Sequence, residues 1–468
     1  MMQPFLNFYK QSRYVLICLV SVLILQSSCK KDNNTRNYPP GSNENINSWI
    51  LDSLKRYYYW SDGLPAKPAL NRAPLDFFSA IRNANDRFSY ILLPSDPSTV
   101  SPSNKSQYGF DYTTIKEKNT GLVFGVVKLV LNDSPASRSG LKRGDYMSKI
   151  NGKIITQENA AALQQELLSG TRVTITLAEL DGNQLKDIDS VELTAGFTFE
   201  QPAVSSITDA GSSKIAYLYI YDFSPGLATS LYNTFMSFKN AGVTELILDL
   251  RYNSGGQVAE AAGLCTMIAS GVSYTTPFIT YKGNKNGGTR SESLGDAASF
   301  DHTLNFNTLL QSNLNLKRVF ILGTGATASA SEVMINNLKP YMQVVLIGEK
   351  TRGKDEASFK ISDARIPKQV EWEMHPIVYK LFNAAGNGSY SAGIDPDISV
   401  TELNDLPLQP FGAPEDPLVK AALNRISGNN TIGIARLKSS NKRNLAAGNI
   451  LADSRAMLTS ASTVITHR

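Results

Sequence analysis

Histidine and cysteine are both scarce in this chain of 468 residues, which holds three of each. The histidines are His302, His375 and His467, so a histidine-rich metal site is excluded and a histidine-based catalytic triad has few candidates. Three cysteines are too few for a disulfide framework. The net charge of +5 is mild, and no block of lysine and arginine stands in the part expected to fold, so no nucleic-acid partner is expected.

Long apolar runs are also lacking, because no stretch reaches the roughly 20 residues that cross a bilayer. The apolar run 14–25 follows Lys10 and Arg13 and predicts the central part of a secretory signal peptide. It ends in Leu-Gln-Ser-Ser-Cys at 25–29, which resembles a bacterial lipobox with Cys29 as the lipidated residue. An ordinary signal peptide with an incidental cysteine is the alternative.

The lipobox resemblance implies a signal peptide at 1–28 and a lipid-anchored, flexible tether at 29–46, where polar residues predominate. The protein is then a lipoprotein of the bacterial cell envelope that contacts a membrane through the anchor at Cys29. Lys30 after the cysteine does not suggest retention at the inner membrane. We therefore expect the outer membrane, with a periplasmic or surface-facing orientation.

The pattern of apolar residues and turns along the sequence divides the mature chain into three folded parts and a tail. This organisation predicts a multidomain α/β protein. Helical spacing of apolar residues predicts a small N-terminal helical domain at 47–100, and strands with turns predict a β domain at 105–198. Residues 200–403 alternate strands and helices, as an α/β core does. The tail, 404–468, is expected to begin with one helix and then to be poorly ordered, apart from a short helix near 451–458.

Three short motifs of the β domain carry a resemblance. They are Ser-Pro-Ala at 134–136, Gly-Leu-Lys-Arg-Gly-Asp at 140–145 and Ile-Asn-Gly at 150–152, and together they resemble a PDZ domain. Tyr108, Gly109 and Phe110 stand where the carboxylate-binding loop of such a domain is expected. The resemblance implies a groove in which backbone N–H groups hold a C-terminal carboxylate and the peptide adds as a strand. A bulged strand end is the alternative for this loop.

Polar loops follow the predicted strands of the α/β core. Strand 318–322 leads into a helix that begins near Ser329, strand 343–347 leads into a loop that ends at Lys354, and strand 244–250 leads into Asn-Ser-Gly-Gly at 253–256. Strands joined by short helical crossovers pair in parallel, and ligands bind beyond their carboxyl ends. We therefore expect Ser329 and Lys354 on one edge of the sheet.

A serine hydroxyl is a poor nucleophile until a base takes its proton. With so few histidines, Lys354 is the candidate base for Ser329, provided that burial lowers its pKa from about 10.4 toward 7. The amide of Ala330 at the helix start, with that of Gly255 or Gly256, is the candidate oxyanion site. Taken one by one, these features also fit a capping box at 329–332, a plain turn and a surface lysine.

Together, three motifs resemble the carboxyl-terminal processing peptidases, also called tail-specific proteases. They are Asp-Leu-Arg-Tyr-Asn-Ser-Gly-Gly at 249–256, Thr-Ala-Ser-Ala-Ser-Glu at 327–332 and Gly-Glu-Lys-Thr-Arg-Gly-Lys at 348–354. The resemblance covers most of 47–403, including Asp-Arg-Phe-Ser at 86–89. It implies a crotonase-like βαβ peptidase core behind a PDZ domain, a dyad of Ser329 and Lys354, and no metal or organic cofactor. The family's spacing from nucleophile to base selects Ser329 rather than Ser331.

The residues that would support the dyad depart from the family pattern. Many members have a glutamine four residues after the lysine, where this chain has Ser358, and an acid at the position of Pro340. Glu332 matches an acid that some members place near the dyad. The resemblance thus implies Glu332 and Ser358 as the support of Ser329 and Lys354.

These features predict a lipid-anchored serine endopeptidase that recognises unfolded or extended polypeptides by their accessible C-termini. Two alternatives remain open at this point. One is a catalytically impaired peptide-binding adaptor or chaperone on the same fold. The other is a different acyl hydrolase or ligand-binding protein on a crotonase-like core.

Overall fold

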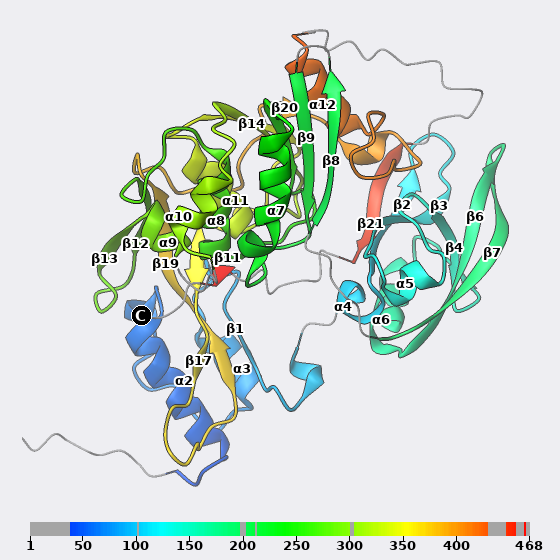
Figure 1. The fold of residues 1–468 in the computed structure, drawn as a ribbon. Coiled ribbons are helices and arrows are strands. Elements are labelled where there is room, and N and C mark those ends of the chain that lie inside the picture. Colours follow the sequence, from blue (N-terminus) through cyan, green and yellow to red (C-terminus); the bar gives the residue numbers. More distant parts are fainter. Residues whose placement is uncertain are drawn as a thin grey trace, which may run out of the picture.

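The computed structural model describes residues 38–100, 103–196, 203–210, 213–299, 304–428, 446–454 and 463–464. The expected signal peptide and lipidated Cys29 lie outside these residues. The described chain forms an N-terminal helical part, a β domain and a larger α/β core, which Figure 1 shows in blue, in cyan to blue-green, and mainly in green to yellow. The multidomain α/β class predicted from the sequence is confirmed.

The N-terminal part packs two amphipathic helices against the core. Its elements are α2 (Asn43–Tyr57), η1 (Ser61–Gly63), α3 (Pro74–Ile81), β1 (Tyr90–Leu92) and η2 (Pro97–Thr99). α2 starts at Ser42, whose hydroxyl accepts a hydrogen bond of 3.2 Å from the amide of Asn45. The apolar faces of both helices join the main hydrophobic core, so this part is not a separate unit.

The β domain is an antiparallel sheet with three helices against it. Its elements are α4 (Asn104–Tyr108), β2 (Phe110–Glu117), β3 (Val123–Val130), α5 (Pro135–Arg138), β4 (Tyr146–Ile150), β5 (Lys153–Ile154), α6 (Ala160–Ser169), β6 (Arg172–Asp181) and β7 (Gln184–Thr194). The strand order is β21-β2-β3-β4-β6-β7, in which β21 (Ala447–Asp453) comes from the C-terminal tail. The domain has its own apolar core beneath α6.

The main sheet of the core has the order β20-β15-β14-β10-β9-β8 and is parallel except for β8. Its elements are β8 (Ala203–Ala210), β9 (Ser213–Ile220), α7 (Leu227–Asn240), β10 (Glu245–Asp249), α8 (Val258–Ile268), β14 (Arg318–Gly323), α11 (Ala330–Leu338), β15 (Gln343–Gly348) and β20 (Ile398–Ser399). Successive strand residues point to opposite faces, so Leu246 and Leu248 meet the core under α7, α8 and α11, while Ile247 faces α12 (Pro417–Ile426). Helices on both faces leave the carboxyl ends of the strands for the site.

Two further sheets close the core around that edge. One has the order β11-β22-β16-β19-β12-β13, and the other joins β1 to β18 and β17. The strands of these sheets and the remaining helices of the described chain are β11 (Gly256–Gln257), β12 (Pro277–Lys282), β13 (Thr289–Ser293), α9 (Leu294–Ala298), α10 (Phe306–Gln311), β16 (Glu356–Ser358), β17 (Ile361–Ser362), β18 (Glu373–His375), β19 (Ile377–Asn383), η3 (Glu402–Asn404) and β22 (Thr463–Val464).

The tail differs from its prediction. The expected short helix near 451–458 is wrong for its described part, because Leu451–Asp453 belong to strand β21. The free edge of β2 supplies hydrogen-bonding partners that an isolated tail lacks, and such partners override local helix preference. The helix expected earlier in the tail is present as α12.

Candidate active site

Ser329 lies at the end of the turn that connects β14 to α11. It is fully buried, and its φ of 62° and ψ of −118° are values that a non-glycine residue rarely adopts. The bend sets Ser329 just before the first turn of α11. Ser331 points elsewhere, since its hydroxyl donates to the carbonyl of Asn253 at 3.2 Å. The conformation therefore sets Ser329 apart from Ser331, as the motif spacing does.

The glycine loop after β10 lies directly against this serine. A side-chain carbon on Gly255 would stand 2.8 Å from the hydroxyl oxygen of Ser329, so the position has no room for one. The amide of Gly255 is engaged, because it donates to the side-chain oxygen of Asn253 at 2.9 Å. Ala330 is the first residue of α11, and such an amide has no carbonyl partner within its own helix. Of the three predicted oxyanion donors, Ala330 therefore fits better than Gly255.

Lys354 is buried, with 1% of its surface exposed. Burial lowers its pKa to about 7, although the carboxylates of Glu356, Asp86 and Glu332 act in the opposite direction. Its Nζ lies 5.1 Å from the ring centre of Phe88, which belongs to the Asp-Arg-Phe-Ser segment of the N-terminal part. A lysine with this pKa is neutral in a large fraction of molecules near pH 7 and can accept a proton.

Glu332 connects the serine and the lysine. Its carboxylate accepts hydrogen bonds from the amides of Ser329 (2.9 Å) and Lys354 (2.7 Å). It also accepts from the amide of Gly353 at 2.7 Å and the hydroxyl of Thr351 at 2.5 Å. Burial raises the pKa of Glu332, whereas all four hydrogen bonds favour the ionised form, which only accepts. The acid thus fixes the backbone of one loop against the other, which is a larger role than its capping box predicts.

The other predicted supporting residue, Ser358, is buried in β16 beside β19. Pro340 follows α11 and is exposed. His375 stacks on Tyr90 at 4.6 Å between ring centres. Burial lowers the pKa of His375 to about 4, and the charge of Lys354 acts in the same direction, so this histidine is neutral near pH 7.

Sequence reasoning missed Phe88 and His375 as neighbours of the lysine. Arg87 fixes the same region, donating to the carbonyls of Gly353 and, at 2.8 Å, Ser391. The Asp-Arg-Phe-Ser motif was the available signal, but no pattern places it against a loop so far along the chain.

Beneath the glycine loop lies a buried charge cluster that explains the Asp-Leu-Arg start of its motif. Arg251 is fully buried and pairs with Asp249 (2.7 Å), Glu402 (2.7 Å) and Asp416 (2.6 Å). Arg143 of the β domain also pairs with Glu402. The two guanidinium groups hold the pKa of Glu402 down to about 2 despite its burial. These pairs fasten the β domain and the tail to the core beside the site.

The predicted carboxylate-binding loop sits at the start of β2. Gly109 has the positive φ of 79° that favours glycine, but its amide donates to the carbonyl of Lys105 at 2.9 Å. Tyr108 is buried, and its hydroxyl donates to the carbonyl of Gly170 at 2.6 Å. Phe110 is buried in the domain core. The loop is thus held by internal bonds in this conformation.

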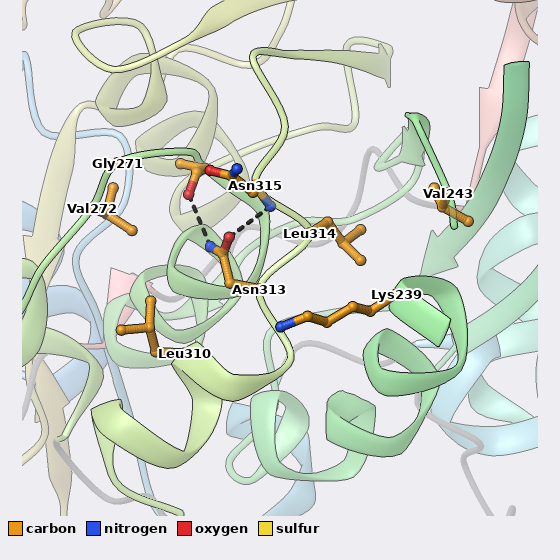
Figure 2. A pocket seen from close by; sticks show the side chains of 9 residues that line it. Lys239, Val243, Gly271, Val272, Leu310, Asn313, Leu314 and Asn315 are labelled. Carbon is orange, nitrogen blue, oxygen red and sulfur yellow. Dashed lines mark hydrogen bonds between the residues drawn. The ribbon is translucent and has the colours of Figure 1, made fainter. Parts of the chain in front are cut away.

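A hollow of about 450 Å³ lies elsewhere on the core. Figure 2 shows it among Lys239, Leu310 and Asn313, and its lining includes residues just before β10 and β14. It therefore stands at the amino ends of the strands, opposite the edge where open α/β sheets bind ligands. Lys239 donates to the carbonyl of Gln311 at 2.6 Å.

In the described part of the chain, no helix is long and apolar enough to cross a membrane. No group of three or more His, Cys, Asp or Glu side chains in that part is placed to hold a metal ion.

The site is thus of the serine-hydrolase type on an α/β core. It combines a buried serine on a strained turn, a buried lysine on the neighbouring loop and a glycine loop beside them. Residues 214–400 match the model of peptidase family S41, and residues 45–90 match the S41 N-terminal domain. The chain belongs to this family, that of the C-terminal processing peptidases.

Individual relatives agree with this assignment. A crystal structure from Bacteroides fragilis, described as an S41 protease, has a TM-score of 0.67 and 26% identity, and covers 84% of this chain and 99% of that one. A Staphylococcus aureus N315 protein named as a CtpA-like serine protease is 22% identical over 333 residues, 71% of this chain and 60% of its own length. The carboxy-terminal-processing protease of Bartonella bacilliformis is 26% identical over 59% of each chain. The chain thus spans about 60% of the length of these curated relatives.

Proposed function

We propose that the protein is a serine endopeptidase that cleaves extended polypeptides by a dyad of Ser329 and Lys354. The observation that carries the proposal is Lys354 itself, buried with a pKa of about 7 on the loop that Glu332 ties to Ser329. A neutral amine next to a serine is the arrangement that general-base catalysis needs when no histidine is at hand.

The proposed reaction has two stages, acylation of Ser329 and hydrolysis of the acyl ester. Lys354 takes the hydroxyl proton as the oxygen of Ser329 attacks the peptide carbonyl carbon. The amides of Ala330 and Gly256 receive the oxyanion, and the protonated lysine then gives its proton to the departing amine. Water hydrolyses the acyl ester on Ser329, again with Lys354 as base. Ser358 would support the lysine from β16.

Substrate capture is assigned to the β domain and to the loop of Tyr108, Gly109 and Phe110. A polypeptide with an accessible C-terminus would add as a strand to β2. Recognition would then depend on extended backbone rather than on a folded surface. We also propose that a lipid on Cys29 holds the enzyme at the bacterial cell envelope, in the outer membrane.

The test combines cleavage with covalent labelling. The chain should cleave an unfolded protein in the presence of EDTA, and a fluorophosphonate probe should label Ser329, as read by peptide mass spectrometry. Ser331→Ala is the matched control and should keep both properties, whereas Ser329→Ala should lose both. Tight peptide binding without cleavage or labelling by the parent chain would instead support the adaptor alternative, and turnover of small esters alone would support the other hydrolase.

Phe88→Ala should shift the pH dependence of cleavage upward. Removing the ring admits water to Lys354 and moves its pKa from about 7 toward the usual value of about 10.4. Loss of the cation–π contact acts the other way, but it is worth only about 0.5–2 kcal/mol, and relief of burial outweighs it. The measurement is kcat/KM from pH 5 to 9, with Phe88→Leu as the apolar control. A midpoint that moves down in Phe88→Ala would contradict the assignment of Phe88 as cover for the base.

A further inference from the structure

Residues 446–454 of the C-terminal segment follow the edge of the β domain. β21 pairs antiparallel with β2, from Ala447 opposite Glu117 to Asp453 opposite Thr113, and α6 also contacts it. Figure 1 shows β21 in red beside β2. The strand runs toward the loop at Tyr108, Gly109 and Phe110. This is the place and the direction in which a peptide would add to a PDZ-like groove.

Side chains strengthen this pairing. Lys128 Nζ lies 2.7 Å from both carboxylate oxygens of Asp453, and only 4% of Lys128 is exposed. Ser454 is buried, and its hydroxyl donates to Asp111 at 2.9 Å while it accepts from the amide of Tyr112 at 3.0 Å. A lysine that is nearly buried needs a partner for its charge, so the contact is selective for an acid at this position.

A second part of the tail lies at the active site. The backbone of β22 pairs in parallel with β11, with Thr463 opposite Gly256 and Val464 opposite Gln257. Val464 also pairs with Ser358 of β16 on its other side. A tail strand therefore stands between the candidate oxyanion glycine and the strand that follows Lys354, where an extended substrate would have to enter.

We infer that the C-terminal segment is an intramolecular ligand that fills both the groove of the β domain and the substrate strand of the active site, and so competes with other polypeptides. The inference rests on the proposed function for its second half. A tethered ligand has an effective concentration in the millimolar range, so an external peptide must compete against it. Release of the tail is the step that opens the site.

The groove is tested by binding, without catalysis. The probe is a fluorescent peptide with the sequence of residues 446–454, and the host is the full chain carrying Ser329→Ala. Adding Asp453→Arg places a cation against Lys128 and should expel the tail, so the dissociation constant of the probe should fall at least about tenfold. Asn449→Arg changes an exposed residue of the same strand and should leave it unchanged. Equal probe affinity in all three chains would overturn the inference for the groove.

The active site is tested by cleavage of an unfolded protein with Ser329 intact. Val464→Pro should release β22, because proline does not fit a residue that is paired on both sides. Both Val464→Pro and Asp453→Arg should raise kcat/KM by about tenfold or more, and Asn449→Arg should not. Cleavage at the parent rate in both variants would overturn the inference while leaving the proposed function standing. If no chain cleaves, the proposed function fails, and the binding experiment still decides whether the tail fills the groove.

Discussion

Lys354→Met should lower kcat for peptide cleavage by about 10³-fold and leave KM almost unchanged. The lysine is buried, with 1% of its surface exposed, so it has little area with which to bind substrate. Its proposed part is to accept the proton of Ser329, and methionine fills a similar volume without a base. Lys354→Arg should be as inactive as Lys354→Met, because the guanidinium keeps its proton at every accessible pH.

The pH dependence separates a base from a structural residue. Since burial lowers the pKa of Lys354 to about 7, kcat/KM of the parent should rise roughly tenfold per pH unit below 7 and level off above about 8. The value of kcat/KM rises with pH because the active form of Lys354 is the neutral amine, which predominates at higher pH. The residual rate of Lys354→Met should lose this inflection.

Lys360→Met provides the matched control, because Lys360 is an exposed lysine a few residues further along the chain. It should keep the parent rate and the parent midpoint. An unchanged inflection in Lys354→Met, or a flat profile in the parent between pH 6 and 9, would contradict the role of Lys354.

The sequence could place Ser329 and Lys354 at one edge of the sheet because β14, α11 and β15 form a local unit with a fixed handedness. Gly255 and Gly256 could be predicted at the same edge of the sheet, because they follow the neighbouring strand, β10. What each amide does could not be predicted, because the bond from Gly255 to Asn253 depends on one side-chain rotamer.

Contacts between distant segments were beyond the reach of sequence patterns. Phe88 covers Lys354 from the N-terminal part, and β21 and β22 come from a tail whose composition indicated little order. Short strands of this kind form because an existing sheet edge offers partners, and the sequence of the strand itself carries little of that information.

Glu332→Gln should cost about 10²-fold in kcat and destabilise the fold by about 3 kcal/mol. The change is small in volume but replaces one carboxylate oxygen by an amide NH₂ group. Each oxygen of Glu332 accepts two hydrogen bonds, so the new donor faces two donors and leaves them without an acceptor. The loops of Ser329 and Lys354 then lose their common anchor, and a shift of a fraction of an ångström is enough to slow the attack.

A readout beyond stability distinguishes positioning of the dyad from general loosening. The Glu332 carboxylate acts to raise the pKa of Lys354, so its removal should move the midpoint of kcat/KM below 7 even as kcat falls. Asp395→Asn is the control, since that acid pairs with Lys350 at the surface and such pairs contribute little. Thermal unfolding and the pH profile of the three chains measure both effects. A midpoint that stays in place with a lower melting temperature would assign Glu332 to the fold alone, whereas a downward shift would show that its charge reaches the base.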